Sequence, residues 1–278
     1  SATGQLLAID LATGERTILL DGLLKPVGIA VTADALWIAG RREIWRAPLV
    51  NYLPSAPVAV LTELPFNGRS LGALTVSPQG NLLFETSGTH SNGMPVEGAA
   101  RLWSLDPANP TAPAVIAKGL KNGYATAFDA AGRLWITDIG DDPVNGLAPP
   151  DELNLWAAGA DFGWVRCFGM REVAANYGGD AAGCAATRAP VALFPPRSTP
   201  TSVVPSPWAG DTLLVALWNE GRVVEVTVAP VGDNATGVVR PWLAGLVAPQ
   251  SLLVWSDGSL LLADHGADTI YRIRPTSR

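Results

Sequence analysis

Residues 137–184, TDIGDDPVNGLAPPDELNLWAAGADFGWVRCFGMREVAANYGGDAAGC, contain the most specific pattern in this chain. An apolar strand runs into an acidic loop, which is followed by the tetrad DELN at residues 151–154 and by an FGW turn that begins at Phe162. A Gly- and Ala-rich part with a pair of cysteines comes next. In most of this stretch the apolar residues do not recur at the spacing of a strand or of a helix. We therefore expect a long excursion at about residues 161–198, inserted between regular elements.

The two cysteines of the chain, Cys167 and Cys184, both lie in this excursion. Two independent buried thiols are one interpretation. A local disulfide is the one that we expect, because a loop without secondary structure of its own gains about 3 kcal/mol of stability from such a crosslink. Disulfides persist in oxidising compartments, so the pair also predicts a periplasmic or extracellular protein.

Apolar segments of one kind recur on both sides of the excursion. Each follows a turn: LWIAG at Leu36, LLFET at Leu82, LWITD at Leu134, LLVAL at Leu213 and LLLAD at Leu260. Their spacing is close to the roughly 40 to 50 residues of one propeller blade, except across the excursion. Period-2 patterns of Val, Ile, Trp and Leu precede and follow each segment, which indicates four strands per unit. The sequence therefore predicts a single all-β domain over residues 1–278, a β-propeller.

The two ends of the chain do not add up to whole blades. The first segment, GQLLAIDLATGERTILLDGL, matches the third and fourth strands of a blade, and the last, TIYRIRP, matches a third strand. We expect a six-bladed β-propeller in which one blade can be incomplete. The N-terminal strands should close the ring against the C-terminal ones.

Composition limits the partners. Hydrophobic residues make up 48% of the chain and charged residues 16%, which leaves ample apolar material for a core and no disordered block. A net charge of −6 argues against nucleic acid or an anionic membrane as partner, since both need a basic face. No apolar run reaches the length of about 18 residues that a membrane span needs.

The order of DELN at Asp151, DFGW at Asp161 and the cysteines resembles the glucose/sorbosone dehydrogenase family, soluble quinoproteins that oxidise sugars. Residues 119–138, 198–217 and 248–273 are similar to further motifs of that family. The resemblance implies a six-bladed propeller outside the cytoplasm. It also implies that pyrroloquinoline quinone (PQQ), a planar quinone with several carboxylates, lies on a Ca²⁺ ion at the top face, and that a histidine takes the sugar's hydroxyl proton.

The catalytic positions implied by the resemblance depart from the family. Arg69 stands where the family has its histidine, and a guanidinium with a pKa above about 12 cannot accept a proton. Asp151 matches the acidic partner of that base. His90 and His265, the only histidines, fall in predicted loops. We interpret both as surface residues, although either could reach the top face.

The PQQ-contacting positions implied by the resemblance are also mostly substituted. Lys121 and Asn122 correspond to an arginine and an asparagine of the family. Tyr124, Trp218 and Gln250 replace a glutamine, a lysine and an arginine. Each lost charge-assisted hydrogen bond removes about 1.5–3 kcal/mol, so PQQ binding should be weak or absent. The remaining cations predicted at the top face are Arg41, Arg69 and Arg197.

A structural Ca²⁺ site is implied as well. In the family, the glutamate of the DELN tetrad and a backbone carbonyl near the FGW turn hold the ion, and Glu152 and Phe162 stand at these positions. The oxygen-rich neighbourhood suits a hard cation. An ion pair between Glu152 and an arginine is the alternative interpretation.

Three functions stay open. The first is a PQQ-dependent sugar dehydrogenase with altered cofactor contacts. The second is a propeller that has lost redox chemistry and binds a small-molecule sugar or a protein partner. The third is a metal-dependent, lactonase-like hydrolase, because Asn122 and Asp138 resemble the metal-holding side chains of calcium-dependent lactonase propellers.

Overall fold

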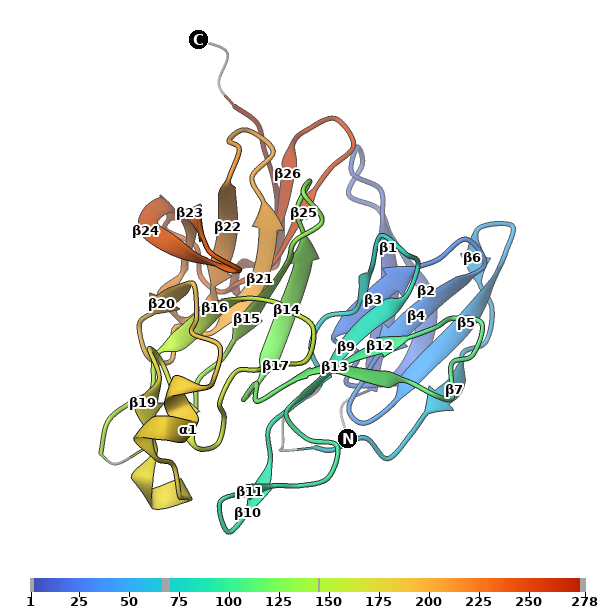
Figure 1. Cartoon of the computed structure of the whole chain (residues 1–278). Coiled ribbons are helices and arrows are strands. Elements are labelled where there is room, and N and C mark those ends of the chain that lie inside the picture. Colours follow the sequence, from blue (N-terminus) through green and yellow to red (C-terminus); the bar gives the residue numbers. More distant parts are fainter. Residues whose placement is uncertain (1–2, 67–70, 145, 276–278) are drawn as a thin grey trace.

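The computed structural model describes residues 3–66, 71–144 and 146–275. It is all-β, with five sheets arranged as the blades of a β-propeller (Figure 1). The predicted all-β propeller is therefore confirmed. No helix in the described ranges is long and apolar enough to cross a membrane.

The blades follow one another along the chain. Blade 1 consists of β3 (Gly28–Val31), β4 (Ala35–Ala39), β5 (Ile44–Val50) and β7 (Val58–Leu61), with β6 (Leu53–Pro54) beside β5. Blade 2 consists of β8 (Thr75–Val76), β9 (Leu82–Thr86), β12 (Arg101–Leu105) and β13 (Ala114–Lys118). Blade 3 consists of β14 (Gly123–Phe128), β15 (Leu134–Asp138), β16 (Asp151–Leu155) and β20 (Ala192–Phe194).

Blade 4 consists of β21 (Pro200–Pro205), β22 (Thr212–Leu217), β23 (Arg222–Val231) and β24 (Asn234–Ala244). Blade 5 has three strands, β25 (Pro249–Val254), β26 (Leu260–Asp264) and β27 (Thr269–Ile273). The five repeated apolar segments are the second strands of the five blades, as predicted.

The N-terminal strands form a separate two-stranded sheet, β1 (Thr3–Ile9) with β2 (Arg16–Leu24). Its Leu6, Leu20 and Leu23 pack against blade 1. Residues of β1 and of blade 5 line a common cavity of about 420 Å³, so the hairpin lies between the first and the last blade. The described residues form five blades and this hairpin, and a complete sixth blade is not confirmed.

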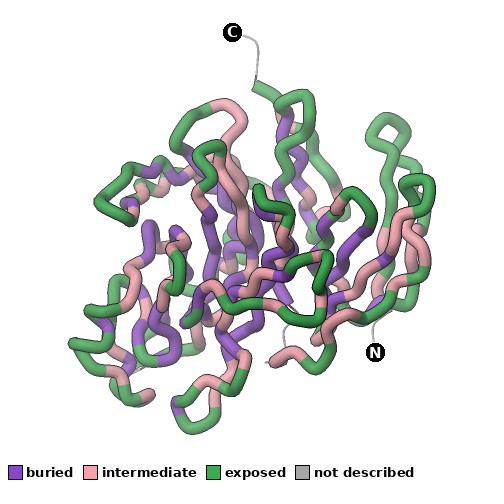
Figure 2. The backbone as a smooth tube through the Cα atoms, turned by 45° about the vertical axis from the view of Figure 1, so that its right-hand side comes forward, coloured by how far each residue is buried: buried purple, intermediate pink, exposed green. Residues whose placement is uncertain are grey.

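The core lies between the blades. The second strands β4, β9 and β15 are buried along their whole length, because each blade is packed between two neighbours that cover its two faces. Such strands are nearly continuous apolar runs in the sequence. Trp37 and Phe84 pack between blades 1 and 2, and Trp135 packs between blades 3 and 4. Figure 2 shows burial concentrated in the strands and exposure in the connecting loops.

The predicted excursion leaves blade 3 after β16 and returns at β20. It contains β17 (Ala160–Asp161), β18 (Cys167–Phe168), β19 (Glu172–Val173), η1 (Ala175–Tyr177) and α1 (Ala181–Ala185). The predicted disulfide is present, with a Cα–Cα distance of 5.6 Å between Cys167 and Cys184. Because β20 is a blade strand, it lies outside the excursion although the predicted range of residues 161–198 includes it. The short β17 pairs with β13 and ties the excursion to blade 2.

Candidate functional site

A pocket of about 230 Å³ lies where four blades meet. Its lining residues, which define the central pocket, are Val27, Asn122, Tyr124, Ile139, Thr199, Thr201, Trp218 and Gln250. Four of the five residues predicted to contact a cofactor are therefore brought together. None of the described lining residues is charged.

Three of the lining side chains come from the same position of successive blades. The register of β14 with β15 skips Tyr124, that of β21 with β22 skips Thr201, and that of β25 with β26 skips Gln250. A β-bulge leaves such a residue out of the ladder and redirects its side chain. The bulges thus supply one pocket-lining side chain from each of blades 3, 4 and 5. Nothing in the alternation of the sequence marks these positions.

Two of these side chains contact each other. The amide of Gln250 donates a hydrogen bond of 2.9 Å to the hydroxyl of Tyr124. Burial raises the pKa of the Tyr124 phenol, and the bond from Gln250 offsets only part of this shift. Tyr124 therefore stays protonated near neutral pH and serves the pocket as a hydrogen-bonding group, not as a base.

The two histidines lie in different places. The ring of His265 is 5.1 Å from that of Trp218, between centroids, so His265 approaches the rim of the central pocket. His90 packs 4.9 Å from Tyr177 and accepts a hydrogen bond at Nδ1 from the amide of Gly93, in the hairpin of β10 (His90–Ser91) and β11 (Met94–Pro95). Neither lines the central pocket. The contact of His265 with Trp218 is a relationship that the sequence did not predict.

The predicted cations among the described residues, Lys121, Arg41 and Arg197, do not line the central pocket. Lys121 Nζ is 3.5 Å from a carboxylate oxygen of Asp141 and 5.7 Å from the ring centroid of Trp164. Arg197 is exposed, and its guanidinium lies 3.8 Å from Asp142. Each of these charges already has an anionic neighbour. The predicted role of Lys121 as a cofactor contact is thus without support from its position.

Asp151 is fully buried and joins two loops. One oxygen accepts a hydrogen bond from the amide of Gly140 at 2.7 Å, and the other accepts from the Ser198 hydroxyl at 3.0 Å and the Thr199 amide at 2.7 Å. Asp151 therefore positions the loop that carries part of the central pocket. The predicted base position, Arg69, lies outside the described residues, so the pairing of these two residues stays a prediction.

Buried polar side chains meet between blades 2 and 3 and form what we call the acidic layer: Glu85, Asp138, Glu152 and Asn154. Burial raises the pKa of Glu85 well above its usual range, that of Asp138 to about 7 and that of Glu152 to about 8. The charge of Asp138 adds to the shift of both glutamates. Glu85 was not predicted as a site residue. The only sequence feature that could have indicated Glu85 is an acidic residue within a mostly apolar segment, LLFET at Leu82.

Asp138 also has a structural task that recurs in the fold. Its two oxygens accept hydrogen bonds from the backbone amides of Lys121 and Asn122. Asp264, at the equivalent end of β26, accepts from the amides of Val247 and Ala248 in the same way. The acidic residue at the end of a second strand therefore fastens the preceding loop in blades 3 and 5. This role weakens the interpretation of Asp138 as a catalytic metal ligand.

The predicted Ca²⁺ position can be tested by its donor atoms. Glu152 accepts hydrogen bonds from the amide of Gly169 at 2.8 Å and from Asn154 Nδ2 at 3.1 Å, and Phe162 is buried nearby in the cluster between blades 2 and 3. Within the described ranges, Glu85 Oε1 and Asn154 Oδ1 are buried without a hydrogen-bond partner. Oxygen donors of this kind suit Ca²⁺.

The same part of the chain brings no three His, Cys, Asp or Glu side chains into a cluster that could hold a metal. An ion in the acidic layer would therefore need amide or backbone oxygens besides the carboxylates. The residues present fit Ca²⁺ if amide or backbone oxygens complete its coordination, with Glu152 as the predicted carboxylate ligand.

PQQ fits the central pocket poorly. Its carboxylates need cationic partners, because burying an anionic oxygen without one costs several kcal/mol. The described lining residues carry no charge. Arg41, another predicted top-face cation, stacks over the ring of Phe66. The central pocket is instead a small neutral site lined by hydroxyl, amide and aromatic groups.

No protein-family profile matches the chain, and no curated protein matches it. Solved structures do match. A putative oxidoreductase (glucose dehydrogenase) from Thermus thermophilus is 17% identical with a TM-score of 0.76, covering 98% of this chain and 88% of that one. The PQQ-bound form of an aldose sugar dehydrogenase from Streptomyces coelicolor is 18% identical with a TM-score of 0.73, covering 96% and 87%.

The PQQ domain of a pyranose dehydrogenase from Coprinopsis cinerea is 14% identical with a TM-score of 0.72, covering 96% of this chain and 86% of that one. Identities this low establish shared architecture. The chain therefore has the β-propeller fold of the PQQ-dependent sugar dehydrogenases, as its motifs predicted.

Proposed function

We propose that this protein is a quinoprotein-fold propeller that binds a small, uncharged, polar molecule of the sugar class in its central pocket without oxidising it. The observation that carries this proposal is the lining of the pocket. All its described residues are uncharged, and they include two amides, three hydroxyls and the ring of Trp218.

The chemistry of these groups suits a polyhydroxylated ligand. The amides of Asn122 and Gln250 and the hydroxyl of Tyr124 offer both donors and acceptors. Trp218 adds an aromatic surface for the apolar face of a sugar ring. At about 230 Å³ the pocket is smaller than the roughly 300 Å³ at which small-molecule pockets usually begin, so a ligand of about one ring is favoured.

A PQQ-dependent sugar dehydrogenase is the second candidate, and the likeness in fold to a PQQ-bound aldose sugar dehydrogenase favours it. Against it stand the uncharged lining and the lack of a histidine among the described lining residues. With no base and no cation for the carboxylates of PQQ among the described lining residues, hydride transfer from a sugar would lack its two main requirements there. A lactonase-like hydrolase needs a metal cluster, and no observation on the described residues favours one.

The disulfide supports a periplasmic or extracellular location, since such bonds persist in oxidising compartments. We propose a small-molecule sugar as the partner. A protein partner is the alternative, and no described surface singles one out.

Adding PQQ and Ca²⁺ to the purified protein tests the proposal. Calorimetry and the absorbance spectrum should show no stoichiometric PQQ binding, and dye reduction with a panel of aldoses should stay at the level of a no-protein control. Ligand-observed NMR with the same aldoses should show binding. Tight PQQ binding or dye reduction would return the protein to the dehydrogenases.

A matched pair of variants locates the binding. Trp218→Ala should weaken aldose binding about tenfold or more, since stacking and apolar contact are lost. Trp255→Ala removes a tryptophan that is 39% exposed and does not line the central pocket, and should leave binding unchanged. Equal effects of the two substitutions would contradict the assignment.

A further inference from the structure

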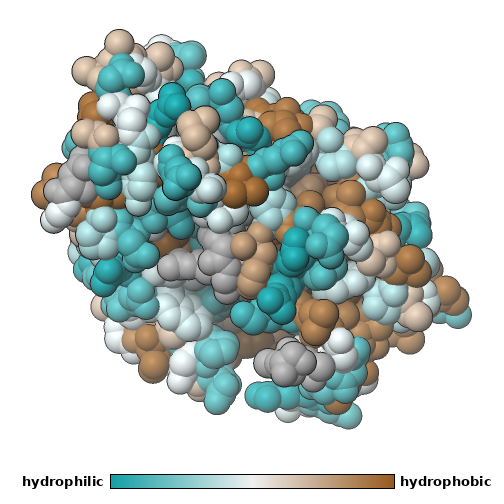
Figure 3. All heavy atoms as spheres, turned by 90° about the horizontal axis from the view of Figure 1, so that it is seen from below, coloured by the Kyte–Doolittle hydropathy of each residue, from teal (hydrophilic) through white to brown (hydrophobic). Residues whose placement is uncertain are grey.

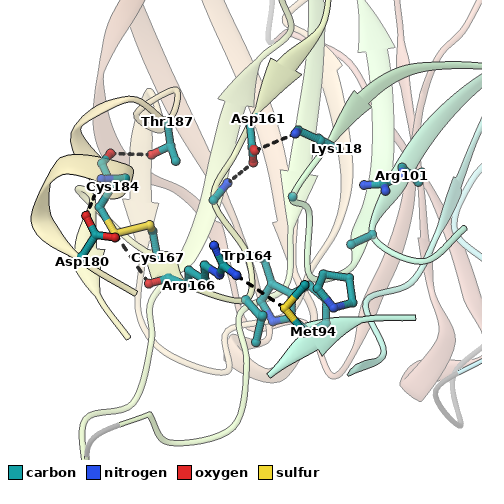
Figure 4. A pocket seen from close by; sticks show the side chains of 16 residues that line it. Met94, Arg101, Lys118, Asp161, Trp164, Arg166, Cys167, Asp180, Cys184 and Thr187 are labelled. Carbon is teal, nitrogen blue, oxygen red and sulfur yellow. Dashed lines mark hydrogen bonds and ion pairs between the residues drawn. A yellow bond between two sulfur atoms is a disulfide. The ribbon is translucent and has the colours of Figure 1, made fainter. Parts of the chain in front are cut away.

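A second cavity, of about 360 Å³, lies between the ends of β12 and β13, the β11 strand and the disulfide-bonded excursion. We call it the excursion pocket (Figure 4). We infer that it is a separate binding site for a small polyhydroxylated carboxylate such as a hexuronic acid. This inference does not rest on the function proposed for the central pocket.

The walls of the excursion pocket are held by backbone and by a covalent bond. Cys167 and Cys184 line one side and are joined to each other. Gly119 and Gly163 line the floor with positive φ values of 80° and 100°. A Cβ on Gly119 would collide with Asp161 and with the amide of Gly163, so the chain passes closer here than any larger residue permits. The cavity is therefore a formed feature of the fold.

Three cationic side chains line this pocket in a protein whose net charge is −6. Figure 4 shows Arg166 entering from the disulfide side and Arg101 and Lys118 from the opposite side. Lys118 is paired with Asp161 at 3.2 Å. The Arg101 side chain makes no ion pair or hydrogen bond with any described residue, and among these residues the guanidinium of Arg166 donates only to the sulfur of Met94, at 3.4 Å.

Two guanidinium groups thus keep most of their donors available at one cavity. Their mutual repulsion is relieved by a bound anion, and the planar fork of arginine binds a carboxylate through two parallel hydrogen bonds. Lys118 adds a third positive charge beside them. The charge pattern therefore selects an anionic ligand group.

Acceptors in the same pocket show that the ligand also carries donors. Asp180 uses one oxygen to accept from the amide of Gly183, which leaves the other for a ligand hydroxyl. Asp161 and the hydroxyl of Thr187 line the same space. A simple inorganic anion has no donors for these carboxylates and would be repelled by them. A carboxylate that also carries hydroxyl groups satisfies both sets.

The surroundings agree with such a ligand. Met94, Pro95 and Trp164 give the cavity an apolar wall that matches the C–H face of a sugar ring. Figure 3 views the molecule from the side on which the β10–β11 hairpin and α1 lie in Figure 1, where hydrophilic and hydrophobic residues are interspersed. The pocket therefore belongs to a mixed surface that suits a small polar ligand.

Titration calorimetry of the whole protein at low ionic strength, with D-glucuronate, D-glucose and sodium sulfate as separate probes, tests the inference. Glucuronate should bind, glucose should not displace bound glucuronate, and sulfate should compete at least tenfold more weakly than glucuronate. Arg101→Gln and Arg166→Gln should each weaken glucuronate binding about tenfold to a hundredfold, the effect of one lost charge-assisted hydrogen bond.

Arg171→Gln is the matched control. Arg171 is an exposed arginine of the same excursion that does not line the pocket, so its loss should not change glucuronate affinity. Trp218→Ala, in the central pocket, should also leave it unchanged, which separates this site from the proposed function. No glucuronate binding, equal weakening by all three arginine variants, or sulfate binding as tightly as glucuronate would each overturn the inference.

Discussion

Gln250 donates a hydrogen bond of 2.9 Å to Tyr124, although 126 residues separate them in the chain. The bond joins the first strand of blade 5 to the first strand of blade 3 at the central pocket. Both residues are skipped in the register of their own blades. A polar contact between two bulges therefore fixes the distance between non-adjacent blades and shapes the site at the same time.

Tyr124→Phe should lower the free energy of unfolding by about 1 kcal/mol, because the partly buried amide of Gln250 loses its acceptor. Urea denaturation followed by tryptophan fluorescence measures the change. Tyr52→Phe is the control, since Tyr52 is 96% exposed and its hydroxyl makes no hydrogen bond with the described residues. A Tyr124 variant as stable as this control would show that the bond contributes nothing.

Stability should fall as pH rises from about 5 to about 8.5. Burial raises the folded-state pKa values in the acidic layer, to about 7 for Asp138 and about 8 for Glu152, and that of Glu85 well above its usual range. In this window the folded state holds protons that the unfolded state has released, so unfolding becomes easier with increasing pH. The lowered pKa values of exposed carboxyls such as Asp257 act only at lower pH.

Glu85→Gln tests the source of this dependence. The amide keeps the shape of the side chain and removes the proton equilibrium, so the loss of stability between about pH 5 and about pH 8.5 should shrink. Glu97→Gln, at an exposed loop position, should leave the dependence as in the unaltered protein. Denaturation midpoints that stay constant over this range would contradict the assignment, and so would a Glu85 variant that behaves like the control.

Calcium should raise the melting temperature by a few degrees, and chelation with EDTA should reverse the rise. The physical reason is that an ion bound only by the folded state stabilises it by RT ln(1 + c/Kd), which rises with the free ion concentration c. Glu152→Gln should abolish the response, since it removes the predicted carboxylate ligand. A melting temperature that is insensitive to Ca²⁺ and to EDTA would contradict the predicted metal site. The acidic layer would then be a cluster that holds protons and no ion.

Replacing Cys167 and Cys184 together by Ser should cost about 2–4 kcal/mol and loosen the excursion first. Limited proteolysis should then cut between β16 and β20 before the blades are attacked. Glucuronate binding should be lost with the wall of the excursion pocket. Aldose binding at the central pocket should persist, because the disulfide does not line it.

The strands were predictable because their signal is local. LWITD at Leu134 and LLLAD at Leu260 are short apolar runs bounded by turns, and full burial between blades is what such runs require. The disulfide was predictable for the same reason, since both cysteines lie in one irregular segment. The resemblance to a family with this fold was what singled out the four predicted cofactor contacts that line the central pocket, and their role stays a prediction.

The blade count and the acidic layer depended on contacts that the sequence does not encode locally. Whether the N-terminal hairpin completes a blade is decided by its packing between blades 1 and 5. Glu85 becomes a proton-holding group because packing between the blades removes it from water, and the charge of Asp138 on blade 3 adds to the shift. The alternation of apolar and polar residues along one strand does not indicate which charged side chain of the neighbouring blade will lie beside it.

The sequence by itself determined the strands, the turns and the crosslink, because each depends on residues close together in the chain. Tertiary structure alone decided which side chains form the two pockets. Tyr124, Thr201 and Gln250 reach the central pocket through bulges set by strand register. Arg101 and Arg166 line one cavity because the excursion folds back over blade 2. Both depend on how each blade is rotated and packed against its neighbour, a long-range outcome of close packing between sheets.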